Sequence, residues 1–307
     1  MIKVFIDGSA GTTGLRIADR LASRQDIELI KICETLRKDP YARRDAICSA
    51  DVAFLCLPDD AAREAIALVG DTDTKIIDTS TAHRVNPDWT YGFPELAGQK
   101  EKIAASKRIA NPGCHASGFI ALVAPLVQNG IIRKNMNLSS FSLTGYSGGG
   151  KKMIAQYEDT QRSELLKGPR QYGLSQTHKH LKEMVHLCGL ENAPAFCPIV
   201  GDFYSGMEVS VPLFCQDIKG TSEDIRTLYK DYYAQGLVRY KETDDGDGFL
   251  SAAAYSGRDD MEVTVFGNEE RILLTARFDN LGKGASGAAI QNMNILLGLD
   301  ETTGLNV

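Results

Sequence analysis

The first 24 residues restrict the folds that are open to this chain. A short apolar run, IKVFID, leads into the glycine-rich GSAGTTG, and LRIADRLASR follows with apolar residues at helical spacing. A strand, a glycine loop and a helix in this order are typical of dinucleotide binding, because glycines let the backbone approach a pyrophosphate that faces the helix N-terminus. The spacing is Gly8-x-x-Gly11-x-x-Gly14 and not the commoner GxGxxG. Since glycines also serve tight turns, the motif needs support from later residues.

Alternation of strands and helices continues to about residue 113. The apolar runs IELIKI, DVAFLCLP and TKIIDTS are strand-like, and DDAAREAIALVG has helical spacing. Near-continuous apolar strands separated by helices indicate a parallel sheet that is covered on both faces. The sequence therefore predicts an α/β fold with a Rossmann-type, doubly wound parallel sheet. Another doubly wound nucleotide-binding fold is the alternative.

The segment after the second strand bears on the choice between NAD and NADP. Glu34 lies 20 residues after Gly14, where a carboxylate would bond a ribose 2′-hydroxyl. Next to it, ETLRKDPYARR supplies the cations Arg37, Lys38, Arg43 and Arg44, which would suit a 2′-phosphate. The alternative for this segment is a solvated loop. We expect NADP as the cofactor, because the cations outnumber the single acid.

The second part of the chain has a different pattern. NLSSFSLTGYSG indicates a longer strand with partial alternation. The later segments MEVSVPLFC, LVRYKE, MEVTVFG and RILLTARFDNL are typical of half-buried, antiparallel strands. The last segment, GKGASGAAIQNMNILLGL, is glycine-rich and then helical, and we expect it to pack back on the nucleotide-binding domain. We place a dinucleotide-binding domain at 1–113 and 285–307, and an α+β domain for catalysis and oligomerisation at 114–284.

Composition excludes several function classes. A formal charge of −6 argues against generic binding of nucleic acid or of an anionic membrane. The seven cysteines are scattered without a CxxC pair, which favours a reducing compartment over a disulfide framework. No apolar run reaches the roughly 18 residues of a membrane span, and the N-terminus lacks the pattern of a signal peptide. We expect a cytoplasmic protein.

One cysteine stands at a junction that favours chemistry. In RIANPGCHASGFIALVAPL, a Pro-Gly turn precedes Cys114, and apolar residues follow at helical spacing. Cys114 is therefore expected in or just before a first helical turn, where free backbone N–H groups and the helix dipole favour a thiolate. The alternative is a small buried apolar side chain.

A reactive cysteine needs a base, and the chain has five histidines. His115 is adjacent to Cys114, but neighbours on a helix do not face each other. QYGLSQTHKHLKEM places His178 and His180 just before a helix that carries Glu183. The two histidines lack a third ligand for zinc, so we expect no metal; a surface or core histidine remains the ordinary alternative. A cysteine and a histidine beside a nicotinamide would form or oxidise an aldehyde.

These motifs resemble the N-acetyl-γ-glutamyl-phosphate reductases in their short branch, nearly end to end. The resemblance rests on GSAGTTG, DTSTAHR, YGFPEL, ANPGCHASG, GYSGGGKK, HKHLKE and DNLGKGASG. It implies relatives among the aspartate-semialdehyde and glyceraldehyde-phosphate dehydrogenases. Two positions depart from the longer branch: Lys182 replaces a proline, and His115 replaces an aromatic residue. Both changes leave the thiol, the histidines and the acid in place.

The resemblance implies roles for individual residues. Cys114 would attack an acyl phosphate, His178 would be the acid–base with His180 close behind, and Glu183 would hold the substrate or orient a histidine. The implied cofactor-binding residues are Gly8, Ser9, Gly11, Thr12, Thr13, Gly14, Arg37, Lys38, Ser80, Asn280 and Gly284. The implied substrate-binding residues are Arg84, Asn111, Ser147, Gly148 and Tyr172, although Arg84 would equally suit a structural salt bridge.

The implied reaction is NADPH-dependent reduction of N-acetyl-γ-glutamyl phosphate to the semialdehyde through a cysteine thioester, in arginine biosynthesis. The resemblance implies a small-molecule acyl phosphate as partner, no nucleic acid or membrane, and a homo-oligomer, either a dimer or a tetramer. A related aspartyl or carrier-bound aminoadipyl or glutamyl phosphate is the alternative substrate. A non-catalytic NAD(P)-binding regulator is the alternative from another class, and it would not need the thiol and the histidine pair together.

Overall fold

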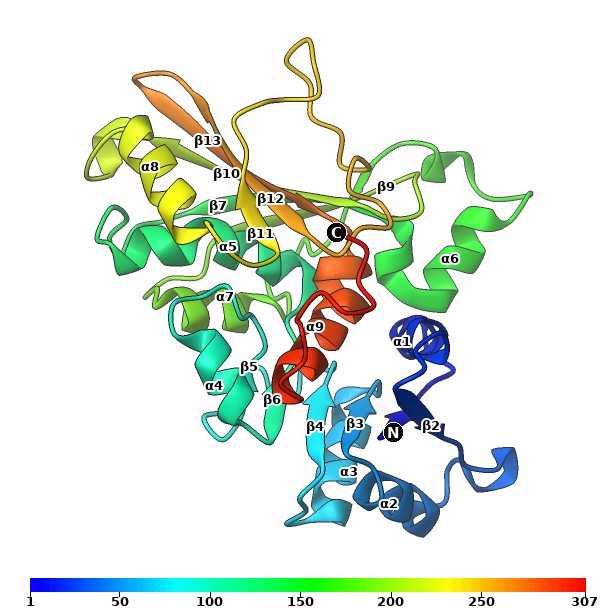
Figure 1. Cartoon of the computed structure of the whole chain (residues 1–307). Coiled ribbons are helices and arrows are strands. Elements are labelled where there is room, and N and C mark those ends of the chain that lie inside the picture. The colour runs from blue at the N-terminus through cyan, green and yellow to red at the C-terminus, as the bar shows by residue number, and fades with distance from the viewer. The chain divides into compact units, whose positions relative to one another are not determined.

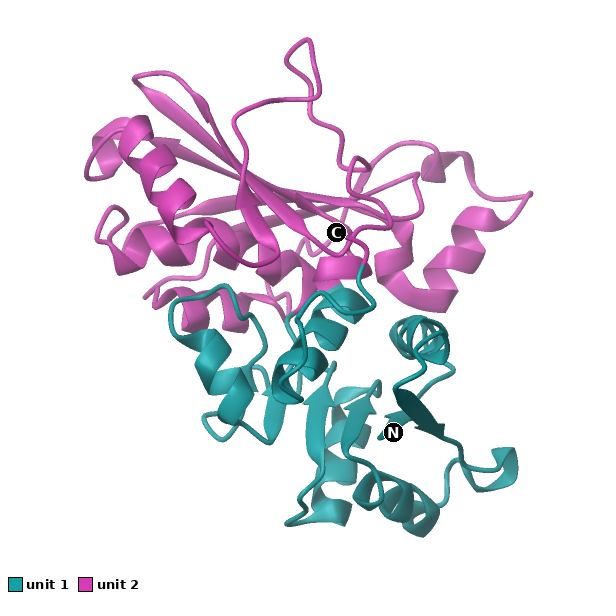
Figure 2. Ribbon diagram, in the orientation of Figure 1, with its two compact units in different colours: residues 1–112, 285–305 teal, residues 113–284, 306–307 magenta.

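A computed structural model describes residues 1–307, and the chain divides into two units (Figure 1). Unit 1 contains residues 1–112 and 285–305, and unit 2 contains residues 113–284 and 306–307 (Figure 2). The segment near the C-terminus therefore belongs to the same unit as the first strand.

Unit 1 is built on a six-stranded parallel sheet with the strand order β2-β1-β3-β4-β6-β5. Its strands are β1 (Ile2–Asp7), β2 (Ile27–Ile30), β3 (Val52–Leu55), β4 (Lys75–Asp78), β5 (Thr90–Tyr91) and β6 (Arg108–Ala110). Its helices are α1 (Thr12–Ala22), α2 (Pro40–Cys48), α3 (Asp59–Val69), α4 (Gln99–Ala105) and α9 (Gly287–Leu296), with a 3-10 turn at Glu34–Leu36. The predicted Rossmann-type sheet is confirmed.

Both faces of this sheet are buried, which explains why its strands are apolar throughout. A row of paired side chains runs across one face: Ile6, Phe54, Ile77 and Ile109. These side chains form one core with buried residues of α1, α4 and α9. The opposite face forms a second core with α2 and α3.

Helix α9 is buried along its whole length, although it contains three side-chain amides. Asn292 Nδ2 donates to the carbonyl oxygen of Gly92 at 2.9 Å, and Asn294 Nδ2 donates to that of Thr303 at 2.9 Å. Gln291 Nε2 donates to the carboxylates of Glu95 and Glu301. Because the amide nitrogens of these buried side chains donate hydrogen bonds, α9 can pack on the sheet of unit 1.

Unit 2 is built on a seven-stranded mixed sheet with the order β11-β12-β13-β10-β7-β9-β8. Its strands are β7 (Ser139–Gly145), β8 (Arg170–Gln171), β9 (Ala195–Gly201), β10 (Met207–Phe214), β11 (Val238–Tyr240), β12 (Met261–Gly267) and β13 (Arg271–Phe278). Its helices are α5 (Cys114–Gln128), α6 (Gly150–Glu158), α7 (Leu181–Cys188) and α8 (Ser222–Tyr232). Short turns lie at Tyr146–Gly149, Glu164–Leu166, Cys215–Asp217 and Gly282–Ser286, the last of them entering unit 1.

The expectation of antiparallel strands in unit 2 is wrong for one pair of the strands named from the sequence, β11 and β12. β7 pairs with β9 in parallel, and β11 pairs with β12 in parallel. Parallel neighbours need a crossover, and the long segments between these strands supply one. A half-buried pattern shows which face of a strand is covered but not the direction of its neighbour.

Helix α5 packs on the sheet of unit 2 and fixes the position of Cys114. Every residue from His115 to Val127 is buried. The helix lies against β10 and β13, and also contacts α7 and α8. Gly118 permits this close approach, because a Cβ there would lie 2.5 Å from a methyl carbon of Val209. The first turn of α5 is therefore held rigidly by the core of the unit.

Candidate active site

Cys114 is the first residue of α5, as predicted, and its side chain is half-buried. Gly113 precedes it with the extended backbone of a helix N-cap. The first N–H groups of a helix have no intrahelical acceptor, so this position favours an anionic sulfur. Gly284 packs against Cys114, because a Cβ on Gly284 would lie 2.9 Å from Cys114 Cβ.

Glu183 connects the turn before Cys114 to the histidine pair. This buried residue of α7 accepts a hydrogen bond from the Gly113 backbone N–H through Oε2 at 3.1 Å. Its Oε1 lies 3.8 Å from His180 Nε2. The carboxylate therefore holds the peptide next to Cys114 and also lies beside a histidine, which favours orientation over substrate binding among its predicted roles.

The two histidines of the HKH segment differ in exposure. His178 is half-buried, and its Nδ1 accepts a hydrogen bond from the backbone N–H of His180 at 3.3 Å. His180 is buried, and the two ring centroids are 4.8 Å apart. Burial, with the charge of Lys179, lowers the pKa of His178. Since Nδ1 of His178 is engaged by this backbone N–H, Nε2 is the ring nitrogen that is available to a substrate.

His115 is a site residue that the sequence argument set aside. Its Nδ1 lies 2.6 Å from Ser142 Oγ, and its Nε2 lies 2.7 Å from Tyr172 Oη. Burial, with the neighbouring His178, lowers the pKa of His115 to about 3, so the ring is neutral near pH 7. Tyr172, which was predicted to line the pocket, is thereby hydrogen-bonded to His115, the residue next to Cys114. No spacing in the sequence indicates these two contacts.

Ser147 and Asn280 were assigned to different ligands, but the structure joins them within unit 2. Asn280 Nδ2 donates to Ser147 Oγ at 3.0 Å, and the Gly206 N–H donates to Asn280 Oδ1 at 2.9 Å. Gly148 lies alongside, since a Cβ there would be 3.4 Å from Asn280 Nδ2. Asn280 therefore supports the loop that carries Ser147 and Gly148.

Different features of the structure explain why the first loop has glycine at positions 8, 11 and 14. Gly8 has a φ of +87°, and a Cβ on it would lie 2.3 Å from the Cys56 carbonyl oxygen. A Cβ on Gly14 would lie 2.5 Å from the Gly8 carbonyl oxygen, so this glycine brings α1 close to the loop. Gly11 is exposed, and a Cβ on it would approach no protein atom closer than 3.4 Å. Internal packing therefore does not require a glycine at position 11, and the bare backbone there leaves room for the close approach of a ligand.

A cavity of about 660 Å³ opens beside this loop in unit 1. Its lining includes Gly8, Ser9, Glu34, Arg37 and Lys38, which the sequence grouped around a dinucleotide. This volume falls in the range of small-molecule and cofactor pockets. The exposed cations at the rim and the bare backbone of the loop both fit an anionic dinucleotide.

Arg43 does not belong to an open cluster of cations, and this corrects the sequence argument. It lies on α2, is buried, and donates from Nε to Asp7 Oδ2 at 3.0 Å. Arg37 is exposed and pairs with Glu34 at 2.9 Å. The segment is a 3-10 turn followed by a helix and not the solvated loop given as its alternative, and Arg37 at the end of the turn is exposed to solvent.

We expect Gly11→Ala to fold normally but to bind the dinucleotide about tenfold more weakly, because the methyl group would stand where a pyrophosphate approaches the backbone. Gly8→Ala is the contrasting variant, since its Cβ collides with Cys56 and its φ is positive. Thermal unfolding and cofactor titration should separate the two. Equal loss of stability in both variants would contradict this reading of Gly11.

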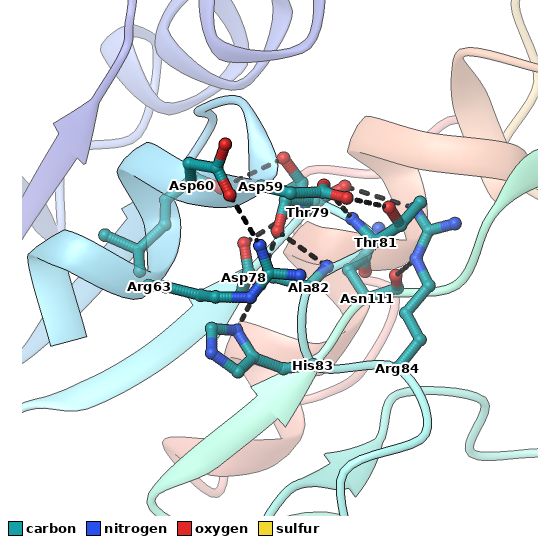
Figure 3. A network of polar contacts seen from close by, with 12 residues as sticks. Asp59, Asp60, Arg63, Asp78, Thr79, Thr81, Ala82, His83, Arg84 and Asn111 are labelled. Atoms are coloured by element: carbon teal, nitrogen blue, oxygen red, sulfur yellow. Dashed lines mark hydrogen bonds and ion pairs between the residues drawn. The ribbon is translucent and has the colours of Figure 1, made fainter. Parts of the chain in front are cut away.

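Another polar network follows β4 in unit 1, and Figure 3 shows its side chains. Asp78 accepts from the Ser80 backbone N–H at 2.9 Å, from Ser80 Oγ at 2.7 Å, and lies 2.6 Å from His83 Nδ1. The His83 ring stacks on Trp89 with centroids 4.1 Å apart. Thr81 bonds the Asp59 carboxylate at the start of α3. The predicted cofactor residue Ser80 is therefore held in place by its hydrogen bonds to Asp78. Asp78 itself could have been found from the sequence, because it is a polar residue at the carboxyl end of an apolar parallel strand.

Arg84 and Asn111 also lie in unit 1, and both are buried. Arg84 Nε donates to the Asn111 carbonyl oxygen at 2.9 Å, and an Arg84 terminal nitrogen donates to that of Thr79 at 3.1 Å (Figure 3). Asn111 Nδ2 donates to the Ala285 carbonyl oxygen at 3.0 Å. Arg84 thus holds two chain segments through their carbonyl groups.

The chain contains no cluster of three or more histidine, cysteine, aspartate or glutamate side chains that is arranged for a metal ion. None of its helices combines the length and the apolar character needed to span a membrane.

Two family models match the chain. One is described as the semialdehyde dehydrogenase dimerisation domain and matches residues 114–280. The other is described as the semialdehyde dehydrogenase NAD binding domain and matches residues 31–105.

Curated proteins are similar over nearly the full length. N-acetyl-gamma-glutamyl-phosphate reductase 2 of Nostoc sp. is 47% identical, with 99% of each chain covered. N-acetyl-gamma-glutamyl-phosphate reductase of Brucella anthropi is also 47% identical, over 96% of this chain and 98% of its own.

Solved structures share the fold at low identity. Aspartate semialdehyde dehydrogenase II of Vibrio cholerae has a TM-score of 0.71 at 14% identity, covering 97% of this chain and 98% of that one. The aspartate semialdehyde dehydrogenase of Francisella tularensis also has a TM-score of 0.71 at 14% identity, covering 97% and 100%.

Proposed function

This chain belongs to the semialdehyde dehydrogenase family, among the N-acetyl-gamma-glutamyl-phosphate reductases, and we propose that it reduces the acyl phosphate through a thioester on Cys114. The reaction yields N-acetyl-glutamate semialdehyde and phosphate, a step of arginine biosynthesis. The observation that carries the proposal is the position of Cys114 at the start of α5, with Glu183 bound to the preceding peptide.

The first step needs a nucleophile that is ionised near neutral pH. The helix N-terminus favours the thiolate of Cys114, which attacks the acyl carbon. A carbon–sulfur bond forms, the bond to the phosphate oxygen breaks, and phosphate leaves with the electron pair. Glu183 acts by holding the Gly113 peptide in place, so that the thiol keeps its orientation at the helix end.

The second step needs a hydride and a mobile proton. When bound, the reduced nicotinamide supplies the hydride that converts the thioester into a thiohemiacetal on Cys114. We assign His178 as the group that protonates the former carbonyl oxygen and takes the proton back as the carbon–sulfur bond breaks. Its half-buried ring presents Nε2, whereas His180 is buried beside Glu183. General acid–base help of this kind contributes about 10²–10⁴-fold in rate.

The substrate carries a phosphoryl group, and two sets of residues are suited to it. Ser147 and Gly148 form a loop that Asn280 holds in unit 2, with backbone and hydroxyl donors. Arg84 and Asn111 are the proposed substrate residues of unit 1, and there they hold the chain near the ends of β4 and β6.

NADP is the proposed cofactor, and unit 1 is proposed to hold it. Support comes from the cavity beside the Gly8 loop, the open position at Gly11, and the cations Arg37 and Lys38 at the rim. Ser9, Thr12, Thr13, Gly14 and Ser80 complete the proposed residues of this unit, and Asn280 and Gly284 are proposed from unit 2.

Alanine at both Arg37 and Lys38 should weaken NADPH binding by about 10–100-fold and NADH binding by less than about twofold. Loss of charge-assisted bonds to a 2′-phosphate is the physical reason. Arg44→Ala is the control, because Arg44 is exposed on α2 and does not line the cavity. Equal weakening of both cofactors in a titration would contradict the assignment of these cations.

We also propose a homo-oligomer in the cytoplasm. Phe141 and Phe214 are exposed on one face of the sheet of unit 2, and the residues of this unit match a family model described as a dimerisation domain. A second copy of the chain would cover such a face. None of the seven cysteines is in a disulfide, which suits a reducing compartment.

Phosphate-dependent oxidation of N-acetylglutamate semialdehyde by the purified protein tests the function, with NADP and NAD compared side by side. We expect turnover with NADP that stops when Cys114 is alkylated. Turnover only with aspartyl or carrier-bound substrates would replace the proposed substrate, and cofactor binding without any turnover would contradict the proposed reaction.

A further inference from the structure

Three side chains from separate elements form a hydrogen-bonded chain beside Cys114. Ser142 lies on β7, His115 on α5, and Tyr172 follows β8. The distances are 2.6 Å from Ser142 Oγ to His115 Nδ1 and 2.7 Å from His115 Nε2 to Tyr172 Oη. Ser142 and His115 are buried, whereas Tyr172 is partly exposed.

The direction of the protons along this chain follows from Ser142. A neutral histidine has one donor nitrogen and one acceptor nitrogen. His115 Nδ1 is the only hydrogen-bond partner of the Ser142 hydroxyl, which is fully buried. A buried hydroxyl that does not donate loses its hydrogen bond to water without replacement, so Ser142 donates to Nδ1. Nε2 of His115 then carries the proton and donates to Tyr172.

The phenol O–H of Tyr172 remains available as a hydrogen-bond donor. Its oxygen accepts from His115, and His115 is its only hydrogen-bond partner within the chain. Burial, and the negative charge of Cys114, raise the pKa of Tyr172, so the phenol stays protonated during the reaction. The low pKa of His115, about 3, keeps the imidazole neutral and the direction of the chain unchanged across the working pH range.

We propose that Ser142 and His115 are positioning residues that turn the Tyr172 O–H toward the acyl oxygen of the group carried by Cys114. Tyr172 would then stabilise the negative oxygen that develops when the thiolate or the hydride adds to the carbonyl carbon. The inference rests on the proposed function for the reacting group, but the orientation of the chain is independent of it.

The orientation can be measured without any substrate. Nitrogen NMR of the full chain with labelled histidine distinguishes the two tautomers, and His115→Phe identifies the signal. We expect a neutral Nε2–H form of His115 from pH 5 to pH 8. A neutral Nδ1–H form, or protonation of His115 near pH 6.5, would overturn the proposal.

The effect on catalysis is tested by a double-mutant cycle. We expect Tyr172→Phe to lower kcat of semialdehyde oxidation by about 100-fold, as for loss of an oxyanion donor, with a smaller change in KM. Ser142→Ala should lower kcat by about tenfold in the native background. In the Tyr172→Phe background it should change kcat by less than about twofold, because Ser142 acts only through the phenol.

Ser140→Ala is the matched control. Ser140 lies two residues before Ser142 on β7, is equally buried, and has no hydrogen-bond partner. We expect this variant to leave kcat unchanged. An equal loss of kcat in Ser140→Ala and Ser142→Ala, or an effect of Ser142→Ala that persists in Tyr172→Phe, would show a packing role and overturn the proposal. An inactive native protein would contradict the proposed function and would leave the tautomer measurement decisive for the orientation.

Discussion

Serine in place of Cys114 should lower turnover by about 10³-fold or more while the protein folds normally and binds the reduced cofactor within a few-fold. The two side chains differ by one atom, but a hydroxyl is not ionised near neutral pH, even at a helix N-terminus. An alcohol is also a poorer leaving group than a thiol in the last step. Steady-state rates in both directions, with a cofactor titration, measure the effect.

Cys197→Ser is the control for this substitution. Cys197 lies on β9 with a half-buried side chain, and we have assigned it no part in the reaction. It should turn over at the native rate. Normal turnover by Cys114→Ser would contradict the nucleophile assignment, whatever the control shows.

Replacing His178 with asparagine should lower kcat by about 10²–10⁴-fold, the usual contribution of a positioned acid–base group. Asparagine retains a polar side chain of similar reach but cannot transfer a proton at neutral pH. His186→Asn is the control, since His186 is exposed on the same helix as Glu183 and lies outside the cluster. If His178→Asn turned over at the native rate, His178 would not be the acid–base group, and the role would be assigned to His180.

The pH dependence gives a second readout on the same residue. Burial and the charge of Lys179 lower the pKa of His178 from 6.5 because they disfavour the cation. Semialdehyde oxidation needs the neutral ring as base, so activity is full above this pKa and falls as the pH falls through it. The acid limb of kcat/KM is therefore expected below pH 6.5, and it should be absent in His178→Asn. A limb above pH 6.5 would contradict the assignment.

The sequence was sufficient where neighbouring residues determine the structure. The strand, loop and helix around Gly8 and the start of α5 at Cys114 follow from local pattern, because turn residues and apolar spacing act over a few positions. The chain from Ser142 through His115 to Tyr172 could not be found in this way. Its partners are separated by 27 and 57 residues and come together only through the fold.

Charge and strand direction were the other weak points of the sequence argument. Arg43 resembled its exposed neighbours, yet a buried Asp7 at the end of β1 pairs with it. An ion pair of this kind depends on which helix packs on which strand. The parallel pairing of β11 with β12 likewise depends on the route that the connecting segment takes between the two strands. Hydrophobic alternation within a strand does not indicate that route.

The two-part composition of unit 1 has a consequence for synthesis on the ribosome. Chains emerge from the N-terminus, and a domain usually folds once its last residue is free. The core that Ile6, Phe54 and Ile77 form in unit 1 also contains Ile290 and Met293 of α9. Part of the apolar surface of residues 1–112 therefore stays uncovered until α9 has been translated. Premature termination anywhere before α9 would leave a nascent chain that chaperones and proteases recognise.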